Sequence, residues 1–193
     1  MNRYRYPYVL FLLLTVALSS GCSEDSNNNA TISPKNLTRD AVCMLDGMIL
    51  LDHPGPKGQV IFKNGESHFF CDTKGLFSAL YDPNYKMKIK QAFVQDFGKR
   101  KWGSYNDRWI AVEQAFFVLG SSQLGAMGPT LATFSARADA DNFAKEFGGS
   151  VLAFNELDEE KFEAYQTRIR QQLRDTMSNT SAPDSNEAVH QHH

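Results

Sequence analysis

The feature that most restricts the fold is the dipeptide Asn64-Gly65, which lies between two runs of β-forming residues. These runs are 59–62 (Gln-Val-Ile-Phe) and 67–70 (Ser-His-Phe-Phe). An Asn-Gly pair readily adopts the positive-φ conformations of the tight turns that join antiparallel strands. The sequence therefore predicts a β-hairpin here, and any fold of this chain has to contain it.

The hairpin begins an order of elements that occurs twice. Asp72 can cap a short helix that stops at Asp82-Pro83, and a further strand is expected at 91–96. In the second half, the strand candidates are 109–112, 115–118 and 130–134, followed by a helix from Asp139 to Gly148-Gly149 and a returning strand at 150–154. We expect an α+β fold of two related ββαβ units packed together, at 41–104 and 105–157.

A long amphipathic helix is expected at 158–177, after the second unit. Its apolar residues recur at helical spacing on one face: Phe162, Tyr165, Ile169 and Leu173. Residues 178–193 are polar and predict a disordered tail.

The first 21 residues have the pattern of a bacterial lipoprotein signal peptide. Arg3 and Arg5 precede a short apolar run at 8–18, and Ser19-Ser20-Gly21 leads directly into Cys22. The run is short for a permanent membrane-spanning helix, which is the alternative interpretation. We expect cleavage before Cys22 and a lipid on its thiol, and Ser23 in the next position favours sorting to the outer membrane.

The mature chain is mildly acidic, because cleavage removes Arg3 and Arg5 from 20 basic residues and none of the 22 acidic ones. No basic stripe is present, so nucleic acid is not an expected partner. Residues 22–40 are rich in Asn and Ser and predict a flexible tether between the lipid and the fold. With 14 Phe residues, the chain can build a packed core.

Two cysteines remain after the lipidated one, Cys43 and Cys71. In an oxidising compartment, the default expectation for such a pair is a disulfide. Cys71 follows the strand 67–70 and precedes a helix, a position that lowers the pKa of a thiol and favours reactivity. A buried thiol or half of a disulfide is the simpler interpretation of Cys71, and we favour it.

Sulfur donors cluster in two segments. The segment 43–48 reads Cys-Met-Leu-Asp-Gly-Met, and Met127 lies in a Gly- and Ser-rich loop at 120–129. Thiolates and thioethers are soft ligands that suit Cu(I) better than zinc, calcium or magnesium. The alternative for the methionines is that they fill gaps in the core. If 67–70 is a strand, His68 and Phe70 share one face and Phe69 the other.

Taken together, these motifs resemble the NosL family of nitrous oxide reductase accessory lipoproteins. The residues that carry the resemblance are Asp46-Gly47-Met48, Gly55-Pro56-Lys57, Phe69-Phe70-Cys71-Asp72-Thr73, Val94-Gln95-Asp96, Trp109-Ile110, Gly120-Ser121 and Met127-Gly128-Pro129-Thr130. They extend over 40–157, in the family's order and spacing. The lipidated cysteine at the start of the mature chain agrees with the family as well.

The resemblance implies a non-enzymatic periplasmic copper(I) chaperone for nitrous oxide reductase, the copper enzyme of denitrification. Cys43, Met48 and Met127 occupy the positions that it implies as Cu(I) ligands, and His68, Cys71 and Asp46 are further candidates. Many relatives have a second cysteine where this chain has Asp46, which leaves one thiolate with thioethers and room for a His or water as a further ligand. With Cys43 and Met48 in one unit and Met127 in the other, the implied position of the ion is between the two units. The implied partners are the reductase, its membrane ABC-type maturation complex and, through the metal, a second copy of this chain.

Two other functions compete with this one. The first is an adaptor lipoprotein that binds no metal and carries a Cys43–Cys71 disulfide. The second is an enzyme, because the family's fold is also similar to organomercurial lyase, whose chemistry uses cysteines and a carboxylate. Cys43, Cys71 and Asp46 are the residues that such chemistry would use, and we expect no such activity.

Overall fold

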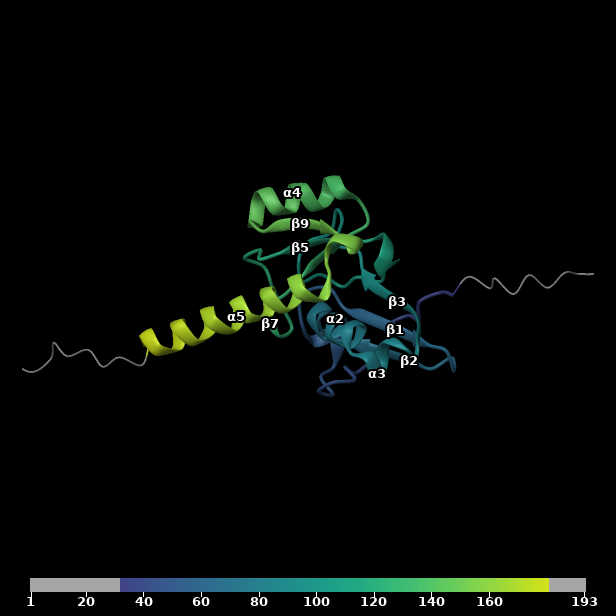
Figure 1. Ribbon diagram of the computed structural model, residues 1–193. Helices are drawn as coiled ribbons and strands as arrows, with labels where there is room; N and C mark the ends of the chain where they lie inside the picture. The colour runs from purple at the N-terminus through teal and green to yellow at the C-terminus, as the bar shows by residue number, and fades with distance from the viewer. Residues whose placement is uncertain (1–31, 181–193) are drawn as a thin grey trace, which may run out of the picture. The chain divides into compact units, whose positions relative to one another are not determined.

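The computed structural model describes residues 32–180 (Figure 1). The predicted signal peptide, Cys22 and the chain from 181 onwards lie outside the described residues. None of the helices among the described residues is both long enough and apolar enough to cross a membrane.

The first ββαβ unit follows the prediction closely. The hairpin strands pair antiparallel with Val60 opposite His68. Asp72 caps the following helix by accepting a hydrogen bond from the backbone N–H of Lys74, and the helix ends before Pro83. The elements are β1 (Gly58–Phe62), β2 (Ser67–Phe70), α2 (Thr73–Tyr81), α3 (Pro83–Lys86) and β3 (Ile89–Gln95).

The second unit repeats this topology. Its strand β5 pairs with the strand before the helix on one side and with the strand after the helix on the other, as β1 does in the first unit. The elements are β5 (Phe116–Leu119), β8 (Ala132–Phe134), α4 (Arg137–Phe147) and β9 (Ser150–Ala153). Helix α4 lies along β9 and β5 in Figure 1, and the α+β prediction of two ββαβ units is confirmed.

One strand belongs to a different sheet from the one expected. β4 (Trp109–Ala111) was predicted in the second unit, but it pairs with β3 and extends the first sheet to the order β2-β1-β3-β4. The backbone N–H of Asp96 donates to Arg108 O at 2.8 Å, and the Arg108 guanidinium lies 2.6 Å from the Asp96 carboxylate. These contacts fold the chain back along the open edge of β3.

The segment predicted as a loop at 120–129 contains a small hairpin. Strands β6 (Leu124–Gly125) and β7 (Gly128–Pro129) pair with each other, and Ala126 and Met127 form the turn between them. Short 3-10 helices complete the connections: η1 (Leu50–Asp52), η2 (Val112–Gln114) and η3 (Phe154–Glu156).

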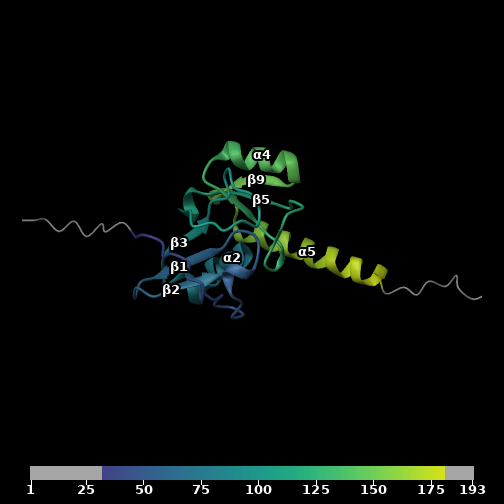
Figure 2. The same ribbon diagram turned by 180° about the vertical axis from the view of Figure 1, so that it is seen from behind.

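The C-terminal helix α5 (Glu159–Thr180) extends beyond the predicted end at 177. Phe162 and Tyr165 are buried near its start, whereas half of Leu173 is exposed (51%) because the helix leaves the body of the fold, as both views show (Figures 1 and 2). The prediction that Leu173 belongs to the packed face was therefore wrong.

Aromatic side chains join the two units. The ring of Phe77 on α2 meets that of Phe117 on β5 edge to face, with 5.1 Å between centroids, and the ring of Phe162 on α5 at 5.7 Å. All three side chains are at most 1% exposed. Burial of this cluster holds the units against each other and against the start of α5.

The predicted tether ends before residue 40. The backbone N–H of Lys35 donates to the side chain of Gln59 at 2.7 Å, and the Gln59 amide donates back to Lys35 O at 3.0 Å. Leu37 is buried in the apolar cluster that contains both cysteines. The chain is therefore fixed to β1 from Lys35 onwards, because Gln59 is a buried amide that needs partners.

Candidate metal centre

Cys43 lies in a tight loop along the open edge of β2. It forms a bridge with Phe69 of that strand, and its own N–H and carbonyl bond to Met48 O and to Gly47 N–H, each at 2.9 Å. Gly47 has a φ of +73°, which a glycine adopts without steric cost. The loop over 43–48 thus closes on itself and presents Cys43 at a fixed position.

Cys43, Asp46 and Cys71 converge in the folded chain. One candidate ligand atom of each, the two sulfurs and a carboxylate oxygen, lies within 4.8 Å of the others. Both cysteines are buried and are free thiols in this structure, whereas Asp46 is exposed. The fold therefore brings together three side chains that could hold a metal ion.

Cys71 is a neutral member of this group. Burial raises the pKa of its thiol because a thiolate loses hydration there, and the neighbouring Cys43 and Asp46 raise it further. Its S–H donates to Asp46 Oδ2 at 3.6 Å. The sequence-based expectation of a lowered pKa before the helix was wrong because burial and the nearby Asp46 carboxylate outweigh the effect of the helix, whereas the interpretation as a buried thiol is confirmed.

Met127 comes to the same place from the other half of the chain. Its side chain is 54% exposed at the turn of the β6–β7 hairpin, and it lines a cavity of about 310 Å³ together with Cys43, Asp46 and Cys71. Gln166 of α5 lines the same cavity. Two sulfurs from the first unit and one from the second therefore face one space, which we call the sulfur cavity.

Met48 is close to this group in a different way. Its half-buried side chain packs against the apolar cluster that contains Cys43 and Cys71, but Met48 does not line the sulfur cavity. The backbone N–H of Met48 donates to Asp46 Oδ1 at 3.0 Å and holds the pKa of Asp46 below its usual value. Asp46 is therefore ionised at neutral pH.

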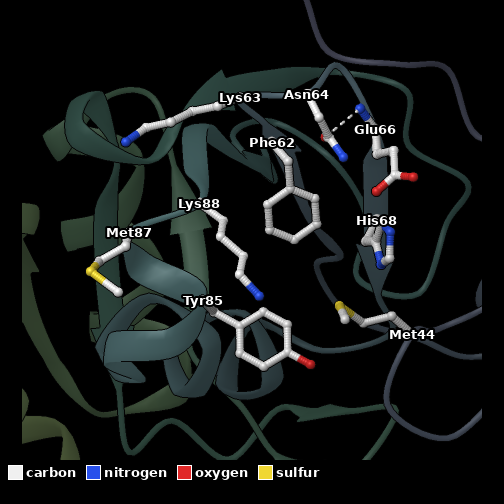
Figure 3. A pocket seen from close by; sticks show the side chains of 9 residues that line it. All are labelled: Met44, Phe62, Lys63, Asn64, Glu66, His68, Tyr85, Met87 and Lys88. Atoms are coloured by element: carbon white, nitrogen blue, oxygen red, sulfur yellow. Dashed lines mark hydrogen bonds between the residues drawn. The ribbon is translucent and has the colours of Figure 1, made fainter.

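The side chain of His68 lies on the face of β2 opposite to that of Phe69, as the alternation of side chains along a strand predicts. Its ring packs edge to face against Phe62 at 5.0 Å and lines a separate pocket with Met44 and Tyr85 (Figure 3). Phe69, the next residue, packs with Trp109 and with the cysteine cluster. The structure does not bring His68 together with the thiols.

The family profile of NosL matches residues 34–162 of this chain. The chain belongs to the NosL family. It is 34% identical to the copper-binding lipoprotein NosL of Stutzerimonas stutzeri over 160 residues, which cover 82% of this chain and 83% of the relative. The copper-binding lipoprotein NosL of Achromobacter cycloclastes is 33% identical, with 80% and 81% of the two chains covered.

A solved structure of the family has the same fold. The crystal structure of the copper chaperone NosL from Shewanella denitrificans superposes with a TM-score of 0.63 at 35% identity. The match covers 66% of this chain and 97% of that one.

Several residues of the NosL motifs serve the fold rather than the sulfur cavity. The side chain of Gln95 accepts a hydrogen bond from the backbone N–H of Lys57 at 3.0 Å. The buried carboxylate of Asp96 accepts from Ser135 and Arg108 at 2.7 and 2.6 Å. Sequence reasoning did not assign these roles, because each depends on partners from distant parts of the chain.

Proposed function

We propose that this chain is a periplasmic metallochaperone that carries one Cu(I) ion in the sulfur cavity, bound by the Cys43 thiolate and the Met127 thioether. Met48 packs against the cysteine cluster without lining the cavity, so its side chain would have to turn toward the ion to join them as a further thioether ligand. The observation that carries the proposal is the convergence of Cys43 and Met127 on one cavity, although 84 positions separate them in the sequence. A thiolate with thioethers is a soft donor set of the kind that selects Cu(I). That relatives are named copper-binding lipoproteins supports the choice of metal.

The protonation states favour a single thiolate. Burial and the neighbouring groups raise the pKa of Cys71 and disfavour its thiolate, so we take Cys43 as the one thiolate ligand and Cys71 as a neutral neighbour. The site then combines one anionic sulfur with neutral sulfurs and has no net charge from copper and thiolate together. Such a site binds the ion without adding a charge to a buried position.

The difference in exposure between Met127 and Cys43 sets the order in which the two ligands are replaced when copper passes to an acceptor. Met127 is 54% exposed, whereas Cys43 is 2% exposed. A ligand of an acceptor protein can therefore replace the thioether of Met127 first, while the thiolate of Cys43 still holds the ion. The thiolate leaves last and takes up a proton, so copper is not released to water between donor and acceptor.

The acceptor in this proposal is nitrous oxide reductase, whose tetranuclear copper centre would receive the ion with the help of the membrane ABC-type maturation complex. A lipid on Cys22 would hold the protein at the outer membrane. The lipoprotein names of the relatives and the signal-peptide pattern support this location.

Titration of the mature chain, with Cys22 replaced by Ser, against a coloured Cu(I) chelator tests the site. We expect one-to-one binding that is lost in Cys43→Ser and weakened in Met127→Ala. Met87→Ala is the matched control, because Met87 is 69% exposed but lines a different pocket, and its affinity should equal that of the parent. An unchanged affinity in Met127→Ala would remove that ligand from the proposal.

The close approach of the two cysteine sulfurs also favours the second candidate, an adaptor with a Cys43–Cys71 disulfide. Intact mass measured without reductant separates the two functions, because the disulfide removes two hydrogens. Protein isolated from the periplasm as the disulfide, with no Cu(I) bound after reduction, would support the adaptor and end the chaperone proposal.

Delivery needs a separate test in cells that make nitrous oxide reductase but lack this chain. Expression of the parent chain should restore the absorption bands of the reductase's copper centres, and expression of Cys43→Ser should not. Restoration by the variant would show that copper reaches the reductase without this site.

A further inference from the structure

Buried hydroxyl groups join the hairpin that carries Met127 to the first turn of helix α2. Thr130, directly after β7, donates its hydroxyl to Asp72 Oδ1 at 2.9 Å, and the hydroxyl of Thr73 lies 3.0 Å from that of Thr130. Thr73 Oγ1 also accepts from the N–H of Leu131 at 3.3 Å. Asp72, Thr73 and Thr130 are each at most 1% exposed, so these hydrogen bonds are shielded from water.

Two further contacts hold the hairpin closer to its tip. The Lys74 ammonium donates to Met127 O at 3.0 Å. Asp72 Oδ2 has no hydrogen-bond partner among the described residues, and it faces Gly125 so closely that a Cβ there would lie 2.3 Å from it. The backbone of the hairpin at Gly125 is therefore in direct contact with the Asp72 carboxyl group.

The hairpin has little internal support of its own. β6 and β7 are two residues each and form two cross-strand pairs. An isolated hairpin of this size is not stable in water. Its position must come from contacts with the rest of the fold. The Trp102 indole N–H donates to Leu124 O at 2.9 Å and the Tyr165 hydroxyl donates to Thr130 O at 3.2 Å. The contacts with α2 converge on Asp72, Thr73, Lys74 and Thr130, which we call the hairpin clamp.

The clamp also lies beside the cysteines. Asp72 follows Cys71 directly, and Asp72 and Lys74 line the sulfur cavity with Cys43 and Met127. Asp72 is thus adjacent in sequence to the thiol of Cys71 in the first unit, and Thr130 lies three residues after the thioether of Met127 in the second. The hydrogen bonds of the clamp therefore link the position of Met127 directly to the segment that carries Cys71.

We infer that Thr130, through its hydroxyl bond to Asp72, is a positioning residue that holds the Met127 thioether over the Cys43 thiolate for Cu(I) binding. The inference rests on the proposed function, in which Met127 is a ligand. Thr130 does not touch the metal. It acts by fixing the stem of the hairpin, so that the thioether does not have to be ordered when copper enters.

Thr130→Val tests this role, because valine keeps the shape of threonine and removes the hydroxyl. The net contribution of one buried hydrogen bond, about 1 to 1.4 kcal/mol, corresponds to a five- to tenfold loss of Cu(I) affinity in the chelator titration. X-ray absorption of the copper-loaded variant should show fewer sulfur neighbours per copper than the parent. Thr130→Ser keeps the hydroxyl and should restore both values.

Thr133→Val is the matched control. Thr133 is equally buried and its hydroxyl also donates within the protein, to Gln95 O, but it lies in β8 and does not contact the clamp. Its loss should lower the free energy of unfolding and leave Cu(I) affinity within twofold of the parent. An equal loss of affinity in both variants would mean that general destabilisation, not positioning, causes the effect, and would overturn the inference.

A double substitution separates this inference from the proposed function. In a Met127→Ala background, Thr130→Val should cause no further loss of Cu(I) affinity. If Met127→Ala weakens binding but Thr130→Val does not, the positioning role is wrong and the ligand remains. If Met127→Ala has no effect, the ligand assignment is wrong and the positioning role falls with it.

Lys74→Leu provides a second variant in case Thr130→Val does not fold. Lys74 is partly exposed, so leucine can replace it with little change in the free energy of unfolding, but the bond to Met127 O is lost and no new sulfur enters the cavity. We expect dissociation of Cu(I) to become about two- to threefold faster, for a partly exposed bond worth about 0.5 kcal/mol. A dissociation rate equal to that of the parent would overturn the clamp as the source of positioning.

Discussion

The buried Lys57 predicts an unusual dependence of stability on pH. Only 3% of this residue is exposed, and its ammonium donates to the carbonyl oxygens of His53 and Pro54 at 2.8 and 2.9 Å. Burial lowers the pKa of Lys57 from 10.5 to about 8, because the ammonium loses its hydration. The attraction of Asp72 raises the pKa again, but by less than burial lowers it. The folded protein thus releases this proton before the unfolded chain does.

The sign of the effect follows from the number of protons bound in each state. Between about pH 8 and 10.5 the unfolded chain holds the Lys57 proton and the folded protein does not, so the free energy of unfolding rises with pH. Below pH 8 both states are protonated and the full cost of burying the charge remains. A difference of 2.5 pKa units corresponds to about 3 kcal/mol in total, of which about 2 kcal/mol is recovered between pH 7.5 and 9.5.

Urea unfolding of the reduced mature chain at pH 7.5, 8.5 and 9.5 measures this effect. The free energy of unfolding of the parent, minus that of Lys57→Met, should rise by about 2 kcal/mol across the series. Cys71, whose raised pKa makes stability fall at alkaline pH, is present in both proteins, so the difference retains only its attraction for Lys57. Lys63→Met, at an exposed lysine, should give a flat difference. A flat difference for Lys57→Met as well would show that the ammonium is hydrated and refute the reasoning.

Three further predictions follow from the packing and the site. Phe77→Ala should lower the free energy of unfolding by about 3 to 5 kcal/mol in urea, because the ring joins both units and α5; a loss below 1 kcal/mol would mean that this contact does not hold them together. Gly125→Ala should lower the free energy of unfolding by about 1 to 3 kcal/mol and weaken Cu(I) binding in the chelator titration, because its Cβ collides with Asp72; unchanged values would contradict the close contact. His68→Asn should leave Cu(I) affinity unchanged in the same titration, because the ring faces a different pocket, and weaker binding would bring His68 back as a ligand.

Local signals in the sequence were sufficient for most of the secondary structure. The Asn64-Gly65 turn, the Asp72 cap and the stop at Pro83 each act over a few residues, and each is present in the structure. The repeated order of elements was enough to predict two ββαβ units. By contrast, the pairing of β4 with β3 depends on an open sheet edge and on the contact between Asp96 and Arg108, which no local pattern contains.

The candidate site divides in the same way. The sulfur donors of Cys43, Met48 and Met127 were compatible with a soft metal or with core packing, and the resemblance to the NosL family selected them as ligands. The tertiary structure decided that Met127 shares a cavity with Cys43, that His68 faces elsewhere, and that Cys71 keeps its proton. Donor chemistry belongs to the side chain itself and can be read in sequence. Distance and hydration are set by the packing of segments far apart in the chain, and they determine which of these donors can meet one ion.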